Sequence, residues 1–306
     1  MSKAGSDALM QDARWVRQLR GNKPAMASAV LLVVVAIAAI AGPWLLPEGY
    51  GEPTRLQFSP PTWKHPLGTD LLGRDMLYRV LAGARISLVV GLAGAVVSLV
   101  IGTGYGLVSG YAGGKVDSAM MRVVDILYAV PRLIIVLVFI NAFDDRLKEW
   151  LVAQQLSDYI GYSKILILIV VLGFIEWLTM ARIVRGQVLA LKSEQFVIAA
   201  RSIGQSHPRI VIQHILPNTV GVIVIYLTLT IPAVILDESF LSFLGLGVVA
   251  PEASWGTLLS EGAAVINPIR SYWWLLVFPA IAMSLTLLAL NFLGDALRDA
   301  LDPRSR

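Results

Sequence analysis

The sequence predicts an all-α integral membrane protein with six membrane-spanning helices. Of its 306 residues, 56% are hydrophobic and only 15% are charged, and the mean hydropathy is +0.70. Ordinary soluble domains carry about 25% charged residues. The apolar residues also gather in long runs separated by short polar segments. A disordered chain and a nucleic-acid-binding domain are therefore excluded, despite a pI near 9.4.

The apolar runs give the spans in order. The first run, 25–46, has no charged residue. As a helix it is about 33 Å long, enough to cross a hydrocarbon core of about 30 Å. It is also longer than the apolar region of about 7–15 residues in a cleaved signal peptide. The later runs are 86–108, 120–142, 165–172, 219–236 and 272–293. Run 120–142 is interrupted by Arg122, Asp125 and Arg132, so five spans is the alternative count.

The distribution of Lys and Arg predicts the orientation. Fifteen of them fall in four segments on one side of the six spans, and seven fall in three segments on the other. The richer segments are 1–24, 113–122, 182–217 and 295–306, and the poorer ones are 48–82, 142–163 and 246–272. Because basic loops stay in the cytoplasm, both termini are expected there. Segment 1–24 is expected to lie on the anionic inner leaflet as an interfacial helix.

The outer segment 142–163 is acidic and polar. Its apolar side chains Trp150, Leu151 and Leu156 predict a short amphipathic helix outside the membrane.

The long inner segment 191–217 predicts two short helices joined at a glycine. Ser193 is a suitable N-cap and Glu194 suits the first helical turn. Four apolar or small residues then follow at helical spacing on one predicted face: Phe196, Ala199, Ala200 and Ile203. Gly204 can end this helix in a left-handed cap.

Two prolines predict the limits of the second helix. Pro208 can open it in the first turn and Pro217 is expected to stop it. An apolar face with small residues would suit docking into a groove of another protein. A helix that packs on its own spans at the membrane surface explains the same pattern, and both interpretations stay open at this point.

This inner segment resembles the coupling loop of bacterial ABC importer permeases. That pattern reads Glu-Ala-Ala, three residues, Gly, nine residues, Ile, any residue, Leu-Pro. The matching residues are Ala199, Ala200, Gly204, Leu216 and Pro217. The sequence departs from the pattern at Ile198, where the family has Glu, and at His214, where it has Ile.

Further segments are similar to the peptide-importer branch of the family. They are Gly68-Thr69-Asp70 with Gly73-Arg74-Asp75, 83–87, 180–186, 238–247 and the ending 294–304. The ending resembles that of the C-type subunit of oligopeptide and dipeptide permeases. The resemblance runs from about residue 10 to the end.

The resemblance implies a type I importer core of five helices with one extra N-terminal helix, located in the bacterial cytoplasmic (inner) membrane. It implies a second homologous permease subunit, two ATP-binding subunits that carry ATP and Mg, and an extracytoplasmic peptide-binding protein. The chain itself is then a transport subunit without catalytic residues. The residues expected to couple to the ATPase are Phe196, Ala199, Ala200, Gly204, His214, Leu216 and Pro217. The expected divisions are 1–24, 25–82, 83–294 and 295–306.

Four acidic residues at or near membrane depth are candidates for a peptide path: Asp125, Glu176, Asp237 and Glu238. A charge at the centre of a spanning helix costs about 2.5–3.5 kcal/mol, so such residues face a bundle interior or water. Pairing with an arginine is the structural alternative. Arg122 is one turn from Asp125 and is the expected partner there. Glu176 lies closest to the centre of a span and is the strongest path candidate.

The remaining motifs indicate no cofactor in this chain. There is no G-x-x-x-x-G-K-[ST] stretch, so no P-loop is expected. Gly102-x-Gly104-x-Gly106 lies inside an apolar run and predicts close helix packing. The three histidines have no metal-ligand spacing and cysteine is absent. An ion-gradient-driven secondary transporter using Asp125 and Glu176 remains the alternative function.

Overall fold

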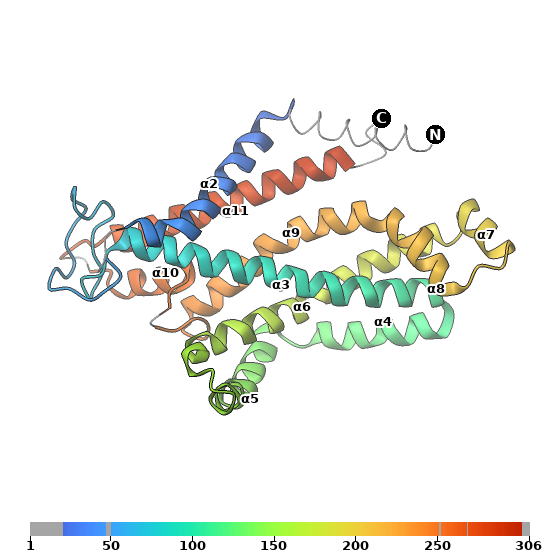
Figure 1. The fold of residues 1–306 in the computed structure, drawn as a ribbon, viewed down its shortest axis with the longest axis horizontal. Helices are drawn as coiled ribbons and strands as arrows, with labels where there is room; N and C mark the ends of the chain where they lie inside the picture. Colours follow the sequence, from blue (N-terminus) through green and yellow to red (C-terminus); the bar gives the residue numbers. More distant parts are fainter. Residues whose placement is uncertain (1–20, 47–49, 251, 268, 302–306) are drawn as a thin grey trace. The chain divides into compact units, whose positions relative to one another are not determined.

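The computed structural model describes residues 21–46, 50–250, 252–267 and 269–301 (Figure 1). All regular elements in these ranges are helices, as predicted. They are α2 (Lys23–Leu45), α3 (Met76–Ala112), α4 (Gly114–Ala129), α5 (Arg132–Ala153), η1 (Ser157–Tyr162), α6 (Ser163–Leu191), α7 (Gln195–Ser202), α8 (His207–Ile210), η2 (Val211–Ile215), α9 (Leu216–Phe243), α10 (Trp255–Ala264) and α11 (Trp274–Leu301). The interfacial helix predicted for 1–24 falls almost wholly outside the described residues, as does the end of the tail 295–306.

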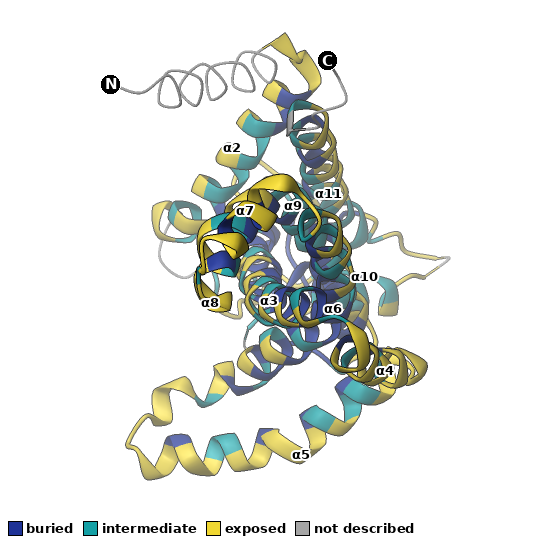
Figure 2. Cartoon of the chain, turned by 90° about the vertical axis from the view of Figure 1, so that its right-hand side faces the viewer, coloured by how far each residue is buried: buried dark blue, intermediate teal, exposed yellow. Residues whose placement is uncertain are grey.

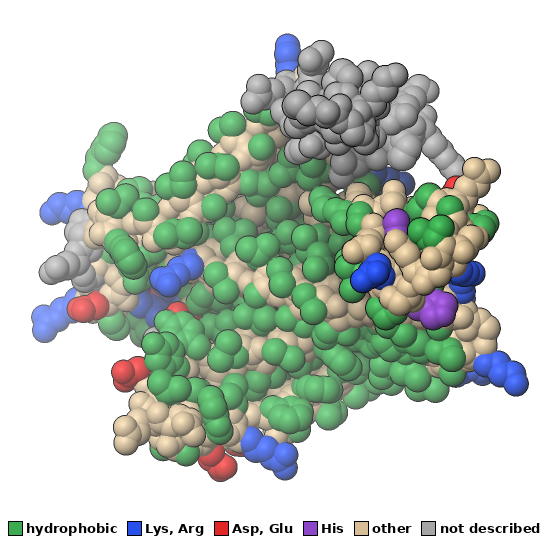
Figure 3. All heavy atoms as spheres, turned by 45° about the vertical axis from the view of Figure 1, so that its right-hand side comes forward, with side chains coloured by type: hydrophobic (Ala, Val, Ile, Leu, Met, Phe, Trp, Pro, Cys, Tyr) green, Lys and Arg blue, Asp and Glu red, His purple; other side chains and the backbone are tan. Residues whose placement is uncertain are grey.

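Five segments are long and apolar enough to cross a membrane, and a bent pair of helices makes a sixth candidate. In chain order, the first two segments are α2 and α3. The third joins η1 to α6, the fourth joins α8 and η2 to α9, and the fifth is most of α11. Hydrophobic side chains cover much of the helical surface visible in Figure 3. This is the expected surface of helices whose solvent is lipid rather than water.

The run predicted as a straight third span, 120–142, is instead broken. Its two helices, α4 and α5, meet at an angle of 88°. Val130 between them has an extended backbone, with φ −81° and ψ 128°, and Pro131 follows it. Proline lacks the N–H that would continue the helix, and it disfavours helical geometry in the residue before it. The break is therefore a local consequence of Pro131.

The short outer helix predicted within 142–163 is not a separate element. Helix α5 continues through this region to Ala153, because no glycine or proline interrupts its sequence. The turn η1 then leads into α6. Leu151 is buried, whereas Trp150 and Leu156 are exposed.

The described residues form two compact units, and α3 and α9 each contribute to both. The first unit contains residues up to Val89 and from Ile235 onward. In it α11 packs against α2 and α10. A core forms around Met76, Leu258 and Trp274.

The loop that precedes α3 in this first unit is fixed by a buried carboxylate. Asp70 accepts the backbone N–H groups of Leu72 and Arg74, each at 2.8 Å. It also pairs with the side chains of Arg74 at 2.7 Å and Arg79 at 2.9 Å. Arg79 reaches Glu261 of α10 as well. The Gly68–Asp75 motif of the sequence is thus a rigid turn tied to the start of α3 and to α10.

The second unit comprises Val90–Val234 and has α6 as its most buried helix. Helix α3 approaches α6 at its glycines. A Cβ on Gly102 would lie 2.6 Å from the Cβ of Met180, and one on Gly106 would lie 2.6 Å from the carbonyl oxygen of Ala181. The predicted close packing is confirmed at these two glycines. Gly104 between them has open space and takes no part in it.

Candidate functional site: the inner loop and a charged helix face

The first helix of the inner loop begins one residue later than predicted. Glu194 is its N-cap, with an extended backbone and no capping side-chain hydrogen bond. The hydroxyl of Ser193 instead donates to the carbonyl oxygen of Ala190, at the end of α6. Ser193 therefore completes the preceding helix rather than opening α7.

Helix α7 divides its small and apolar residues between two faces. Val197 and Ala200 are buried, whereas Phe196, Ile198 and Ile203 are 38%, 52% and 76% exposed. In Figure 2 the dark blue, buried positions of α7 lie on one side of the helix and exposed positions lie on the other. The sequence predicts one exposed face for Phe196, Ala200 and Ile203, but the structure buries Ala200 and leaves the other two exposed. One face of α7 holds the loop in place, and the other is open to a partner.

The glycine corner is confirmed. Gly204 has φ +78°, in the left-handed region that residues with a Cβ disfavour. The N–H of Gly204 donates to Arg201 at 3.0 Å, and the N–H of Gln205 donates to Ala200 at 3.1 Å. The side chain of Gln205 also contacts Nε2 of His214 at 2.8 Å. This contact places His214 inside the loop, where it ties the corner to the second helix.

The second helix begins as predicted but does not stop at Pro217. Ser206 is the N-cap of α8 and Pro208 lies in its first turn. The chain then runs through the π-helical turn η2 directly into α9, with Pro217 in the first turn of α9. A π turn removes the regular i−4 bond that a proline would break. The side chain of Asn218 accordingly donates to the carbonyl oxygen of His214, at 2.7 Å.

A buried apolar cluster connects the loop to the spans. It contains Val197, Ala200, Ile210 and Ile215 from the loop, and its remaining members come from three spanning helices: Leu107, Met180, Val184, Val188 and Ile223. Leu216 packs on the edge of this cluster. The loop is therefore packed against α3, α6 and α9 rather than lying separately on a surface.

Ion pairs join α4 and α5 to α6 in the same unit. Arg182 donates to Asp125 at 2.6 Å, and Arg132 lies 2.9 Å from Glu176. The partner expected for Asp125 was Arg122, one turn away. The structure gives Asp125 a partner on another helix instead, because α4 and α6 lie side by side there.

The side chains of the Asp125–Arg182 ion pair are partly exposed, although the helices that carry them are largely apolar. The side chain of Asp125 is 61% exposed and that of Arg182 is 44% exposed. The Tyr128 ring lies under the Arg182 guanidinium, 4.2 Å from it. Exposed charge on a spanning helix must face water or a partner, because lipid would not solvate it.

Asp237 and Glu238 belong to the other compact unit. Glu238 is fully buried and bonded to Ser87 at 3.1 Å and to Ser242 at 2.7 Å. The Ser87 hydroxyl in turn accepts the backbone N–H of Trp255. Glu238 thus connects α3, α9 and the start of α10. Asp237 is half-buried.

The ion pair between Asp117 and Arg185 was not predicted from the sequence. Arg185 donates to both carboxylate oxygens of Asp117, at 2.5 and 2.6 Å, and Ser109 donates to Asp117 at 2.5 Å. A signal was present, because Arg185 follows Arg182 by three residues and so continues its helix face. The acid partner, 68 residues away, has no such signal.

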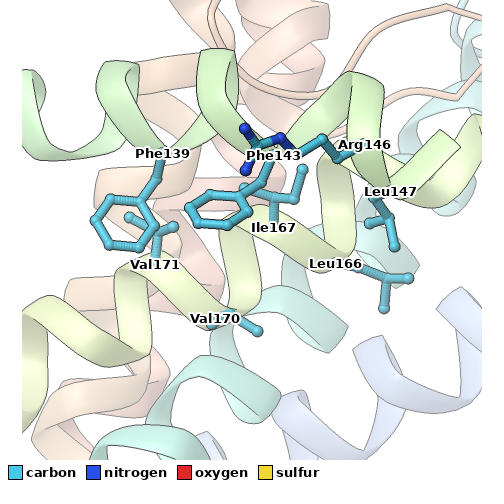
Figure 4. Close-up of a pocket in the computed structure, with 8 residues that line it drawn as sticks. All are labelled: Phe139, Phe143, Arg146, Leu147, Leu166, Ile167, Val170 and Val171. Atoms are coloured by element: carbon cyan, nitrogen blue, oxygen red, sulfur yellow. The ribbon is translucent and has the colours of Figure 1, made fainter. Parts of the chain in front are cut away.

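A cavity of about 470 Å³ lies between α5 and α6 (Figure 4). Figure 4 shows the rings of Phe139 and Phe143 beside Val170 and Val171. Arg146 supplies the one charged side chain of the lining. The cavity therefore lacks the paired polar groups needed to hold the two charged ends of a peptide.

Long apolar helices, a bent pair and a helix–glycine–helix loop packed on the spans define a membrane transport component. Comparison with known proteins gives the same class. Residues 102–306 match the family model of the binding-protein-dependent transport system inner membrane component. Residues 9–61 match the N-terminal TM domain of oligopeptide transport permease C.

Curated relatives cover nearly the whole chain. The dipeptide transport system permease protein DppC of Bacillus subtilis is 43% identical over 99% of this chain and 88% of its own length. The oligopeptide transport system permease protein OppC of Escherichia coli K12 is 46% identical over 98% and 92%. The OppC protein of Haemophilus influenzae is 43% identical over 98% and 90%. The chain belongs to the family of binding-protein-dependent transport system inner membrane components.

Proposed function

We propose that this chain is one of two permease subunits of an ATP-driven importer that moves oligopeptides or dipeptides into the cell. Its partners are a second, homologous permease, two cytoplasmic ATP-binding subunits and an extracytoplasmic peptide-binding protein. ATP and Mg bind on the ATP-binding subunits. The names of the relatives support peptide as the cargo. The excess of Lys and Arg in the inner segments supports cytoplasmic termini.

One observation carries the proposal: α7 presents apolar side chains outward while it is anchored from behind. Ile198 and Ile203 are 52% and 76% exposed after the end of α6, and Phe196 is 38% exposed. Such a face suits the groove of another protein better than it suits water. Gly204 turns the chain immediately after this face, so α7 stands as a short docking helix.

The same packing supports a mechanism of alternating access. When the ATP-binding subunits close, α7 moves with them as a rigid contact. Val197 and Ala200 then displace the cluster that includes Met180 and Val184 of α6. Because packed cores transmit displacement, the spans rock and the path changes its open side.

The peptide path is proposed to run along the charged face of α4 to α6. Glu176 and Asp125 supply carboxylates for a peptide amino group, and Arg132 and Arg182 supply the balancing charge. The exposure of the Asp125–Arg182 pair supports a water-filled surface there. Glu238, fully buried and bonded to serines, is better suited to a structural role in its own unit.

Affinity purification of the tagged chain followed by transport in proteoliposomes tests the proposal. We expect two ATP-binding proteins and a second permease to copurify, and uptake to require ATP and the binding protein. Ile203→Asp places a charge on the docking face and should lower recovery of the ATP-binding subunits at least tenfold. A buried isoleucine contributes about 1.5–3 kcal/mol, which corresponds to that factor or more.

Ile269→Asp is the matched control, because Ile269 is also a highly exposed isoleucine, 89% against 76% for Ile203, in a different, non-helical segment. It should leave the recovered complex unchanged. Recovery of the chain alone, with uptake driven by a proton or sodium gradient, would instead identify a secondary transporter.

A further inference from the structure

A basic pocket lies where the inner loop meets the spans. It has a volume of about 460 Å³ and is lined by Tyr111 and Ala112 at the end of α3, Lys192 after α6, Arg201 of α7 and His207 of α8. All five residues belong to the Val90–Val234 unit. Lys192, Arg201 and His207 contribute basic groups, and none of the lining residues is acidic. In Figure 3, basic and histidine side chains gather at the end that carries α7 and α8.

The lining side chains are held in place by one another. The Tyr111 hydroxyl contacts Nδ1 of His207 at 2.8 Å, and the two rings meet edge to face. Lys192 donates to the carbonyl oxygen of Tyr111 at 2.5 Å, and its ammonium lies 5.6 Å from the centre of the Tyr111 ring. When Nδ1 accepts a hydrogen bond from the Tyr111 hydroxyl, the neutral imidazole carries its own proton on Nε2. Both basic groups therefore keep N–H donors for a ligand.

The pocket has more positive than negative charge. The Arg201 side chain makes no ion pair or hydrogen bond with the described residues, so its guanidinium has its full set of donors. Asp117 acts on Lys192 electrostatically, but both of its oxygens are already engaged by Arg185. Cations gathered in one pocket repel one another, and a bound anion reduces that cost.

We propose that this pocket binds a phosphate group, from either a phospholipid head group or free phosphate. Guanidinium and ammonium groups together are the usual phosphate ligands, and basic pockets at the cytoplasmic ends of spans suit lipid head groups. One water occupies about 30 Å³, so the pocket has room for a hydrated phosphate. A phosphate there joins Lys192 to Arg201 and His207, and thereby fixes the coupling loop on the spans. The choice of leaflet rests on the orientation given under the proposed function.

The test uses the assembled transporter in nanodiscs of phosphatidylcholine, with phosphatidylglycerol replacing part of the lipid in one arm. In a second arm inorganic phosphate is titrated against chloride. Binding is followed by native mass spectrometry and by the Tm of the complex. We expect one of the two additions to raise the Tm. Lys192→Gln combined with Arg201→Gln should weaken binding about twenty-five-fold, since each cation contributes about fivefold near an anionic surface.

Arg201→Gln alone removes a side chain with no partner in the described part of its chain, so it should keep the fold and weaken binding about fivefold. Arg209→Gln is the matched control, because Arg209 carries the same charge on α8 and does not line the pocket. A response to phosphatidylglycerol identifies a lipid site, and a response to inorganic phosphate identifies a soluble ligand. No response to either, or equal loss in Arg209→Gln, overturns the proposal. Copurification of the ATP-binding subunits tests the proposed function separately.

Discussion

The glycines of α3 allow the packing of two spans to be tested by a matched pair of variants. Gly106→Ala places a Cβ 2.6 Å from the carbonyl oxygen of Ala181 and 2.8 Å from the Cβ of Val184. Both contacts are with rigid parts of α6, so the helices must separate. Overpacking of this kind costs about 1–3 kcal/mol. Small residues at such crossings are what let helix backbones approach in a membrane.

Gly104→Ala is the control, because no heavy atom lies within 4 Å of its added Cβ. Alanine in place of glycine inside a helix gains about 0.5–1 kcal/mol. This gain applies to both variants, so they should differ by the overpacking cost alone, about 1–3 kcal/mol in stability. At about 2–4 °C per kcal/mol, Gly106→Ala should melt several degrees below Gly104→Ala.

The assay is thermal unfolding of the detergent-solubilised chain, followed by the loss of its monodisperse peak in size-exclusion chromatography. If Gly104→Ala were as destabilised as Gly106→Ala, the packing of α3 on α6 would not explain the glycines. Equal loss at both positions would point instead to a role for the whole glycine motif, such as ligand binding.

The other variants separate function from folding. Gly204→Ala places a Cβ on a left-handed backbone, which costs about 1–2 kcal/mol although no atom lies close to the added Cβ. Uptake should therefore fall while membrane insertion stays normal. The control Gly186→Ala also adds a Cβ without close neighbours and should transport normally. Ala200→Leu overpacks the buried cluster by about 1–3 kcal/mol and should lower Tm and uptake, whereas Ala199→Leu, on the exposed side, should leave Tm unchanged. Glu176→Gln keeps the size of the side chain but removes the charge opposite Arg132; uptake should fall with the complex intact, and normal uptake would exclude Glu176 from the path.

Local chemistry made much of the fold predictable. Length and apolarity located the helices, because crossing a hydrocarbon core requires both. The corner at Gly204 and the helix start at Pro208 followed from backbone preferences that act within one or two residues. The break at Pro131 had the same kind of signal, but the apolar run on both sides of it obscured the bend.

Features set by distant contacts could not be predicted in the same way. Arg122 and Arg182 are both plausible partners of Asp125, and only the packing of α4 on α6 selects Arg182. Likewise, helical spacing fixes the position of Ala200 on α7 but does not predict which side of the helix is buried. Its burial depends on Ile210 and Met180, which belong to other elements. Pro217 does not end its helix, because the π turn before it accommodates the ring.

The arrangement of α6 gives a physical reason to propose that the coupling helix α7 and the peptide path belong to the same compact unit. Met180 and Val184 of α6 pack in the cluster that holds the buried side of α7. Arg182 and Arg185, on another side of the same stretch, hold the acids of α4. In the proposed mechanism, a displacement of α7 reaches the charged face through α6 alone, without an intervening flexible segment. This argument predicts that softening the cluster, as in Met180→Ala, uncouples ATP hydrolysis from uptake. Uptake that falls only in proportion to hydrolysis would contradict it.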